Sequence, residues 1–550
     1  MSEKKCNLCY IRQITQPMRS AKSLADAKPY DNGVTKPPMG WSSWNCFRNS
    51  IDENKIEEIA DALVKTGLSE VGFTSVNLDD NWHSSMRDEN DELQGDLERF
   101  PSGIPTLIEK LNRKGLKVGL YTSNGTLTCE DLPASFGKEE KDAYTFAKWG
   151  AEFFKYDFCH HQAFTPKAPY VASIGLTKKG DGNEKITVSV KDATLGGRAK
   201  LVPDENLEAG AHVEGLDKNK GIIIFEKIEA EEGEYTLTIT TRKIGDRKDK
   251  FLAVEVNDDD AFIVTVPGCA KFNFYARVQC KIKLKSGGNV IKLYNPLLNK
   301  ADGYMFQYRH MGKMLKQATE RVAQERGTQE KPITYSICEW GFNRPWHWGK
   351  TAGNQWRTTP DIRPWWWWIK LIYERTVRLY KYADKGHYND PDMLEVGNGK
   401  LTFDQNKSHF SVWCMMSSPL ILGNDVRKFI KEDGSIDEEN VVLKIVKNKK
   451  MIAVDQDELS KQCKRVKFGM KCDVLVKELS DGYAVCFFNK SGSQAKCKFN
   501  INKLDGDKYL GFKEKDGYAV EDLWTDETFA SNGLFTPTLP PYGVVVYKVK

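Results

Sequence analysis

The sequence predicts an α/β protein centred on a (β/α)8 barrel, which one β-sandwich interrupts after the fourth strand and a C-terminal antiparallel β-sandwich follows. Three observations support this. Between residues 35 and 163, short apolar runs alternate with amphipathic stretches, as is typical of βαβ units and a parallel sheet. From 166 to 303 the chain is β-rich, with Gly and Asp turns and no amphipathic helix of any length. The alternation then resumes, and because eight strands can be counted, a barrel fits better than a doubly wound sheet.

The eight barrel strands are expected at apolar runs that end in polar residues. Amphipathic stretches at 52–68 and 103–116 predict helices between them, and a further helical pattern covers 301–325. In order, the strands are PPMGWSSW (37–44), FTSVNLDD (73–80), KVGLYT (117–122), FFKYDFC (153–159), ITYSIC (333–338), WRTTPDI (356–362), HYNDPD (387–392) and PLILGND (419–425). The expected domains are an N-terminal extension (1–34), the first barrel half (35–165), the inserted β-sandwich (166–303), the second barrel half (304–458) and the C-terminal β-sandwich (459–550).

Composition and charge narrow the function classes. Of the 550 residues, 40% are hydrophobic and 29% charged, and the net charge of +5 is too small and too spread to indicate nucleic acid or membrane partners. No apolar run is long enough to span a bilayer. The polar start lacks the apolar core of a signal peptide, and the thirteen cysteines are scattered. We therefore expect a cytoplasmic protein, or a secreted one if a signal peptide has been removed, and leave homo-oligomerisation open.

Polar side chains gather at one end of the predicted barrel, where the strands finish. The active site of such barrels lies at the carboxyl ends of the strands. Several carboxylates, one lysine and one arginine around aromatic residues suit a sugar, because aromatic faces cover its apolar side and charged groups bind its hydroxyls. These charged residues are Asp79, Asp80, Lys155, Asp157, Arg357, Asp361, Asp390 and Asp392. A carbohydrate substrate is therefore predicted, with one ionised and one protonated carboxyl group doing the chemistry.

The motifs at the strand ends also resemble those of a known family. They are KPPMGWSSWNCF, NLDDNWH, GLYTSNGTLTC, FKYDFC, YSICEWG, WRTTPDI and NDPDMLEVGN. Over about residues 35–163 and 304–550, and in this order, they resemble glycoside hydrolase family 27, whose best-known members are α-galactosidases. The resemblance implies a (β/α)8 TIM barrel, a C-terminal antiparallel β domain and a retaining, two-step mechanism. We expect no cofactor and no catalytic metal.

The resemblance assigns the two catalytic residues. Asp157, in KYDFC, corresponds to the nucleophile, and Asp361, in WRTTPDI, corresponds to the acid/base. A retaining mechanism implies that their carboxyl groups lie roughly 5 to 5.5 Å apart. The nucleophile must stay ionised, and the adjacent Lys155 favours that state.

The same resemblance gives the expected substrate-binding set. Asp79 and Asp80 match the acidic pair that receives the 4- and 6-hydroxyls, which selects galactose over glucose. Lys155 is expected to reach the 3- and 4-hydroxyls, and Arg357 to approach the 2-hydroxyl. The remaining expected substrate-binding residues are Trp44, Tyr121, Cys338, Glu339, Trp340 and Asp392.

The loop after the fifth strand is expected to set specificity at the 2-position. Family members that accept N-acetylgalactosamine have small residues there, whereas this chain has the bulky run CEWGF. We therefore predict a retaining, exo-acting α-galactosidase rather than an α-N-acetylgalactosaminidase. Asp79, being shorter than the residue expected of a β-L-arabinopyranosidase, disfavours that activity. A catalytically inactive galactose-binding protein is disfavoured because both Asp157 and Asp361 are present.

The positions of the cysteines can also be compared with the disulfides of this family. Cys129 and Cys159 match a family disulfide, whereas Asn81 stands where many relatives have a cysteine, so a bridge to the region of Cys46 is not expected.

The insertion resembles β-jelly-roll carbohydrate-binding modules related to families 6 and 35. We favour support of the barrel and an oligomer interface over glycan binding, because no aromatic cluster marks a sugar platform. Such modules often hold calcium, and Asp302 matches one ligand, but the usual acidic residues are missing from ITVSVKDA, which disfavours calcium.

Four successive tryptophans, Trp365–Trp368, directly follow the acid/base strand. On a helix they cannot all face the core, so at least one is expected to be exposed. Packing against a neighbouring domain or subunit is favoured over a sugar subsite.

Overall fold

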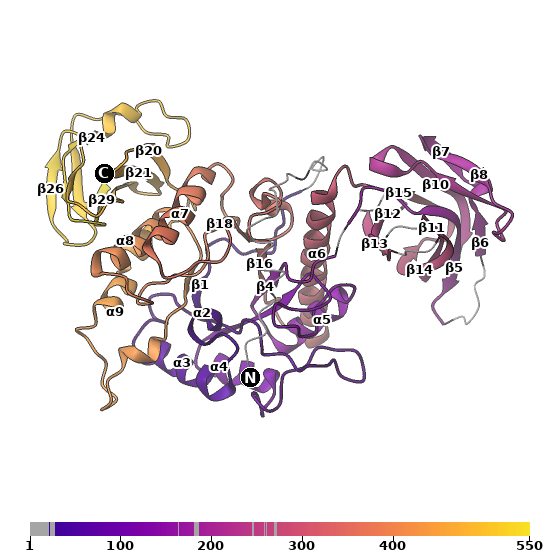
Figure 1. The fold of residues 1–550 in the computed structure, drawn as a ribbon, viewed down its shortest axis with the longest axis horizontal. Coiled ribbons are helices and arrows are strands. Elements are labelled where there is room, and N and C mark those ends of the chain that lie inside the picture. The colour runs from indigo at the N-terminus through magenta and orange to yellow at the C-terminus, as the bar shows by residue number, and fades with distance from the viewer. Residues whose placement is uncertain are drawn as a thin grey trace. The chain divides into compact units, whose positions relative to one another are not determined.

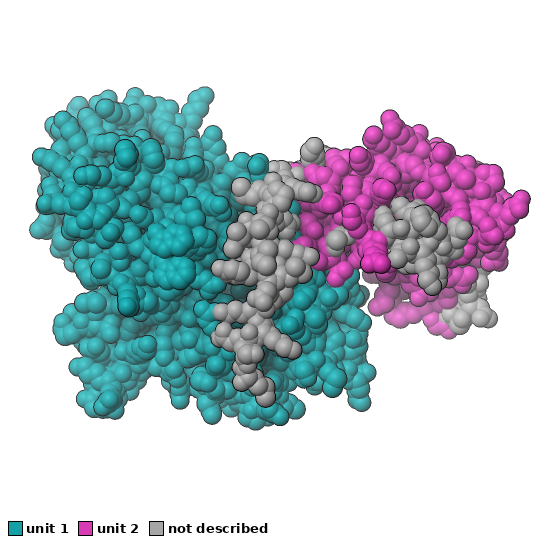
Figure 2. Space-filling model, viewed as in Figure 1, with its two compact units in different colours: residues 1–18, 28–160, 311–550 teal, residues 19–27, 161–310 magenta. Residues whose placement is uncertain are grey.

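The computed structural model describes residues 21, 28–162, 164–180, 186–244, 247–257, 259, 261–268 and 272–550. The described chain forms two compact units (Figure 2). The first comprises Lys28–His160 and Met311–Lys550, and the second comprises His161–His310. Most of the predicted N-terminal extension lies outside the described residues.

The first unit is built on an eight-stranded parallel sheet that curls into a barrel (Figure 1). Strand β1 pairs with both β2 and β19, and a parallel bridge between Leu394 and Leu422 links the segment after β18 to β19. All eight predicted strands are present, which confirms the predicted barrel. They are β1 (Met39–Ser42), β2 (Ser75–Asn77), β3 (Lys117–Ser123), β4 (Phe153–Asp157), β16 (Thr334–Cys338), β17 (Gln355–Arg357), β18 (Tyr388–Asp390) and β19 (Leu420–Leu422).

Helices follow the barrel strands, and their sequences explain their bounds. The Asp52 side chain caps the N-terminus of α3, whose buried stripe includes Ile56, Ile59 and Leu63. The predicted helices at 52–68, 103–116 and 301–325 are confirmed as α3, α4 and α6. The helices are α2 (Ser43–Phe47), α3 (Glu53–Lys65), α4 (Ile104–Arg113), α5 (Glu139–Trp149), α6 (Lys300–Arg326), α7 (Trp366–Thr376), α8 (Phe403–Met415), α9 (Val441–Val446) and α10 (Lys449–Asp455).

Two glycines allow the short strands β1, β2 and β3 to lie close together. A Cβ at Gly40 would lie 2.2 Å from the backbone oxygen of Ser75, and one at Gly119 would lie 2.1 Å from Asn77 Oδ1. Neither position has room for a side chain, so the sequence requires glycine there.

The second unit is a sandwich of two antiparallel sheets. One sheet has the order β13-β12-β15-β10-β7, and the other has the order β14-β11-β5-β9-β8 with β6 paired to β5. Ile223 and Phe225 of the first sheet share a buried core with Leu237 and Ile239 of the second. The strands are β5 (Tyr170–Lys178), β6 (Ile186–Ser189), β7 (Thr194–Gly197), β8 (Lys200–Pro203), β9 (Ala211–Glu214), β10 (Gly221–Ala230), β11 (Gly233–Ile244), β12 (Lys250–Val256), β13 (Phe262–Val266), β14 (Phe272–Leu284) and β15 (Gly287–Tyr294). The jelly-roll assignment stays a prediction.

A C-terminal antiparallel β domain packs against the barrel within the first unit. Its main sheet has the order β20-β21-β22-β29-β25-β26. Helix α7 is fixed to it because Tyr373 Oη donates to Asp473 Oδ2 at 2.9 Å and Glu374 pairs with Lys490 at 2.9 Å. The strands are β20 (Lys464–Lys467), β21 (Cys472–Leu479), β22 (Gly482–Asn489), β23 (Ala495–Lys496), β24 (Phe499–Asn500), β25 (Tyr518–Asp522), β26 (Thr528–Ser531), β27 (Leu534–Phe535), β28 (Thr538–Leu539) and β29 (Val544–Val549). Across the described ranges, every helix is too short or too polar to cross a membrane.

Candidate active site

One cavity at the carboxyl ends of the barrel strands collects most of the predicted site residues. Ten of the twelve predicted catalytic and substrate-binding residues line it, and Cys338 and Glu339 do not. The lining residues are Trp44, Asn45, Asp79, Asp80, Tyr121, Cys129, Lys155, Asp157, Trp340, Arg357, Asp361, Asp392 and Met393. Strands far apart in the sequence therefore contribute to a single charged cavity, as the barrel topology predicts.

Asp157 is the last residue of β4 and is buried. Its carboxylate accepts hydrogen bonds from Tyr121 Oη at 3.1 Å and from the backbone N–H of Phe158 at 2.8 Å. Burial raises the pKa of Asp157 to about 6, against the charge of Lys155, which lowers it, while Asp361 and Asp79 raise it further. The predicted effect of Lys155 is therefore present, but burial outweighs it. Asp157 is ionised at neutral pH and becomes protonated in mildly acidic solution.

Lys155 binds the other acidic side of the cavity rather than Asp157. Its Nζ lies 2.8 Å from Asp79 Oδ2 and 5.1 Å from the ring centre of Tyr121. Burial lowers the pKa of Lys155, but Asp79, Cys338 and Asp157 together raise it well above the usual lysine value, so the ammonium stays charged. A fixed cation therefore lines the cavity beside Asp79, where it can donate charge-assisted hydrogen bonds to a polar ligand.

Asp80 is held more tightly by the backbone than its neighbour Asp79. Its two oxygens accept from the N–H groups of Asn81 at 2.8 Å and of Glu130 at 3.0 Å. Burial raises the pKa of Asp80 to about 7, although hydrogen bonds from Thr128 and these N–H groups lower it. Asp80 can therefore meet a hydroxyl group as an acceptor or, once protonated, as a donor.

Arg357, Asp361 and Asp392 form a charged cluster on the far side of the cavity. Arg357 Nη2 lies 2.6 Å from Asp392 Oδ2 and 3.1 Å from Asp361 Oδ1. Asp392 also accepts from the backbone N–H groups of Ile362 and Met393, at 2.7 and 2.8 Å, so it anchors the loop that carries Asp361. The Asp361 side chain is 32% exposed. The two predicted catalytic carboxyls therefore lie in one cavity with different solvent access, which suits different roles.

The loop after β16 is arranged differently from the prediction. Glu339 is buried away from the cavity, and its carboxylate accepts from the backbone N–H and the side-chain amide of Asn343, at 2.9 and 2.8 Å. Cys338 is also buried, and its Sγ receives a hydrogen bond from Arg357 at 3.5 Å. Of this run only Trp340, with φ of 57°, lines the cavity. The predicted crowding at the 2-position therefore depends on Trp340 and not on Glu339.

Two residues that line the cavity were not predicted from the sequence. Asn45 and Met393 line it beside Trp44 and Asp392. Each directly follows a predicted site residue in the sequence, and this adjacency is the signal that could have identified them. Asp390 lines a second, adjoining cavity with residues that include Ser336 and Gln355.

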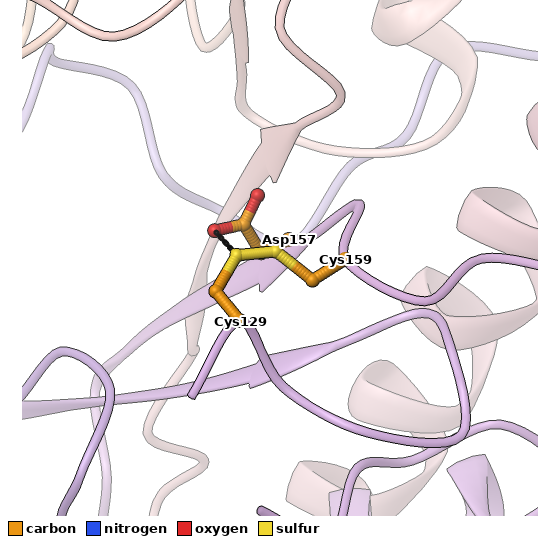
Figure 3. Close-up of side chains that lie close together, drawn as sticks. All are labelled: Cys129, Asp157 and Cys159. Atoms are coloured by element: carbon orange, nitrogen blue, oxygen red, sulfur yellow. Dashed lines mark hydrogen bonds between the residues drawn. A yellow bond between two sulfur atoms is a disulfide. The ribbon is translucent and has the colours of Figure 1, made fainter. Parts of the chain in front are cut away.

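A disulfide joins Cys129 and Cys159 beside Asp157 (Figure 3), with a Cα–Cα distance of 5.1 Å. Cys129 Sγ lies 3.9 Å from Asp157 Oδ2. Gly125 permits this approach of the two loops, because a Cβ there would lie 2.2 Å from the backbone oxygen of Cys159. The predicted pair is confirmed, and Cys46 is free, as expected. Cys129, Asp157 and Cys159 are close enough to hold a metal, but sulfurs bonded to each other offer no thiolate, so the group does not fit a metal site.

Removing this disulfide is expected to weaken the fold. Cys129→Ser/Cys159→Ser should lower the free energy of unfolding of the first unit by about 2–4 kcal/mol, because the 30-residue separation leaves a large loop unconstrained in the unfolded chain. Thermal unfolding with and without a phosphine reductant measures this. The double variant should not respond to the reductant. Equal midpoints for oxidised and reduced wild type would contradict the expectation.

Asp302, which matches one ligand of the disfavoured calcium site, binds backbone at the start of a helix. Its Oδ2 accepts from the backbone N–H groups of Leu298 and Asn299, both at 2.8 Å, at the start of α6. These bonds satisfy backbone amide groups at the helix N-terminus, so the position of Asp302 has a structural explanation.

Comparison with known families assigns this arrangement. A family model described as alpha galactosidase A matches residues 36–181 and 285–457, and one described as the alpha galactosidase C-terminal beta sandwich domain matches residues 470–549. The chain belongs to the alpha galactosidase A family. It is therefore a glycoside hydrolase, and the segment that the first model leaves unmatched, 182–284, lies within the inserted sandwich.

Relatives match this family member over nearly its whole length. An α-galactosidase A of Cellvibrio japonicus is 27% identical over 541 residues, which cover 96% of this chain and 94% of the relative. The crystal structure of α-galactosidase I from Mortierella vinacea is 23% identical, with a TM-score of 0.63, and covers 94% of this chain and 98% of that chain. A putative α-galactosidase from Bacteroides fragilis is 26% identical, with a TM-score of 0.60, and covers 94% and 79% of the two chains.

Proposed function

We propose that this glycoside hydrolase is an exo-acting α-galactosidase that releases terminal α-linked galactose with retention of configuration. The observation that carries the proposal is that Asp157, at the end of β4, and Asp361, after β17, line one cavity, one buried and one partly exposed. Family membership and α-galactosidase relatives along almost the whole chain support the activity.

The different environments of Asp157 and Asp361 suit the two roles that a retaining reaction requires. Asp157 attacks the anomeric carbon while Asp361 gives its proton to the glycosidic oxygen, so the C–O bond breaks and the aglycone leaves as an alcohol. Asp361, now ionised, takes a proton from water, and the resulting hydroxide attacks the anomeric carbon. The bond to Asp157 breaks, and galactose leaves with its original anomeric configuration.

The charged walls of the cavity fit the hydroxyl pattern of galactose. Asp79 and Asp80 receive the 4- and 6-hydroxyls, and Lys155, fixed by Asp79 at 2.8 Å, reaches the 3- and 4-hydroxyls. Arg357 approaches the 2-hydroxyl. Trp44, Tyr121 and Trp340 supply apolar walls, while Asp392 acts by holding Arg357 in place.

The inserted sandwich has a supporting role in this proposal. Among the described residues of His161–His310, the large hydrophobic side chains that are exposed are Leu201 and Leu298, and neither is aromatic. Stacking on a sugar needs an exposed aromatic face. A module related to carbohydrate-binding families 6 and 35 that serves the barrel or an oligomer interface agrees best with this surface.

A panel of p-nitrophenyl glycosides tests the proposal. We expect kcat/KM for the α-galactoside to exceed those for the α-N-acetylgalactosaminide and the β-L-arabinopyranoside by about 100-fold or more, and the first product seen by proton NMR to be α-galactose. A preference for either of the other glycosides would assign that activity instead. Binding of galactose with no turnover would indicate a binding protein.

Trp340 and Glu339 provide a matched pair for specificity. Trp340→Ala opens the cavity wall, so it should raise the ratio of N-acetylgalactosaminide to galactoside turnover by about tenfold. Glu339→Gln should leave this ratio unchanged, because Glu339 bonds Asn343 instead of lining the cavity. An equal change in both variants would refute the assignment of the 2-position wall.

A further inference from the structure

The tryptophan run after Asp361 divides into two outward and two inward side chains. Trp365 and Trp367 are 54% and 58% exposed. Their rings stack at 18° with centroids 5.9 Å apart. The expectation that at least one of the four is exposed is confirmed. The exposed pair presents flat apolar surface to solvent, and neither residue lines the cavity.

The inward pair fixes the run in position. Trp366 packs edge to face against Phe488 and Tyr542 of the C-terminal domain, with centroid distances of 6.0 and 5.5 Å. Trp368 Nε1 donates to the backbone oxygen of Asp361 at 2.7 Å. Packing against a neighbouring domain, the role favoured from sequence, therefore describes Trp366 but not the exposed pair.

The exposed pair is joined to the proposed acid/base by a continuous chain of contacts. Trp367 packs edge to face on Trp368, with centroids 5.2 Å apart, and Trp365 stacks on Trp367. Trp368 in turn donates a hydrogen bond to the backbone oxygen of Asp361. Since Asp361 protonates the leaving oxygen, the aglycone leaves on the side of the cavity where Asp361 lies. The stacked rings therefore belong to the leaving-group side.

We propose that Trp365 and Trp367 form a platform that binds the sugar residues of an oligosaccharide aglycone. This inference rests on the proposed function. The cavity holds the terminal galactose, and the next sugars must lie outside it, where the stacked pair of indole faces can cover the apolar face of a pyranose. Exposing two large apolar rings is otherwise unfavourable, and such a patch marks an interaction surface. Continuity with the acid/base, through Trp368, selects the aglycone as its occupant.

Two kinds of substrate distinguish an effect on aglycone binding by the platform from an effect on the catalytic step. α-Galactosyl fluoride has a single-atom leaving group, whereas raffinose and an α-galactosyl mannotriose carry sugar aglycones. Trp365→Ala/Trp367→Ala should lower kcat/KM for at least one of the two oligosaccharides about tenfold, mainly by raising KM, and should change kcat/KM for the fluoride less than twofold. Trp365→Phe/Trp367→Phe keeps aromatic faces and should retain most of the activity on oligosaccharides.

Phe468→Ala is the matched control, because Phe468 is a 64% exposed aromatic residue of the C-terminal domain. It should affect neither kind of substrate. Unchanged kcat/KM for both oligosaccharides in the alanine double variant would overturn the platform, and so would an equal loss on all substrates, which would indicate a disturbed Asp361. A fall from dimer to monomer in sedimentation without a kinetic change would assign the rings to a second copy of the chain. If wild type hydrolyses neither the fluoride nor the oligosaccharides, the proposed function itself fails.

Discussion

Asp157→Asn is expected to reduce kcat/KM for α-galactosides by about 10⁴-fold or more and, at the same time, to stabilise the first unit above pH 6. An amide in place of the nucleophile cannot form the glycosyl-enzyme bond, and a 10⁴-fold loss corresponds to about 5.5 kcal/mol of activation free energy. Hydrolysis of α-galactosyl fluoride measures the loss, since this substrate requires no proton from Asp361.

The gain in stability follows from the direction of the pKa shift. Burial raises the pKa of Asp157 from 3.8 to about 6, so the folded chain binds this proton more readily than the unfolded chain. Ionised Asp157 therefore costs stability, fully above pH 6 and progressively less down to pH 4. Because asparagine carries no charge, the variant should be more stable by roughly 3 kcal/mol at pH 7 and nearly unchanged at pH 4. Thermal unfolding at both pH values tests this.

The same shift predicts the acid side of the activity profile. Only the ionised form of Asp157 attacks, so kcat/KM for α-galactosyl fluoride should fall as pH drops through about 6. A profile that stays flat down to pH 4.5 would show that burial does not control this carboxyl group.

Glu139→Gln is the matched control for a buried acid. Glu139, the first residue of α5, is buried, and burial raises its pKa to about 7, yet it does not line the cavity. Its replacement should also stabilise the fold above neutral pH but leave hydrolysis unchanged. Loss of activity in both variants would mean that the effect of Asp157→Asn is not specific to the nucleophile.

The barrel was predictable because each of its strands can be recognised from a short stretch of the sequence. Each of the eight strands is an apolar run that ends in polar residues, and parallel strands bring those ends to one face whatever lies between them. This is why Asp157 and Asp361 meet in one cavity although the whole inserted sandwich separates β4 from β16. The hydrophobic pattern changed from alternating helices and strands to strands alone, which located the insertion.

Other features depend on three-dimensional packing that no local pattern contains. The adjacent Lys155 was expected to favour ionised Asp157, but Lys155 Nζ binds Asp79, and burial of Asp157 sets the sign of its pKa shift. Glu339 and Trp340 are neighbours in sequence, and the left-handed backbone at Trp340 places only the latter on the cavity. The outward tryptophans could not be identified either, since their orientation is set by Asp361 and the C-terminal domain.

The second large effect is expected from Asp361→Ala, and it should depend on the leaving group. Without the acid, kcat/KM for an oligosaccharide should fall by about 10²–10⁴-fold, whereas kcat/KM for α-galactosyl fluoride should fall far less because fluoride leaves without a proton. The glycosyl-enzyme then lacks its base, so it accumulates and KM for the fluoride falls. The fold should survive, because Arg357 keeps Asp392 at 2.6 Å as its charged partner.

Azide distinguishes the two carboxylates by the configuration of the product. In Asp361→Ala, azide enters the vacated acid/base side and attacks the covalent intermediate on Asp157, so it should yield α-galactosyl azide after two inversions. In Asp157→Ala, azide replaces the nucleophile and attacks the substrate directly, so a single inversion should yield β-galactosyl azide. Proton NMR of the products identifies each anomer, with wild type in azide as the reference. Exchanged anomers would reverse the two roles, and because burial keeps Asp157 from water while Asp361 is partly exposed, the physical account of the site would then have to be reversed as well.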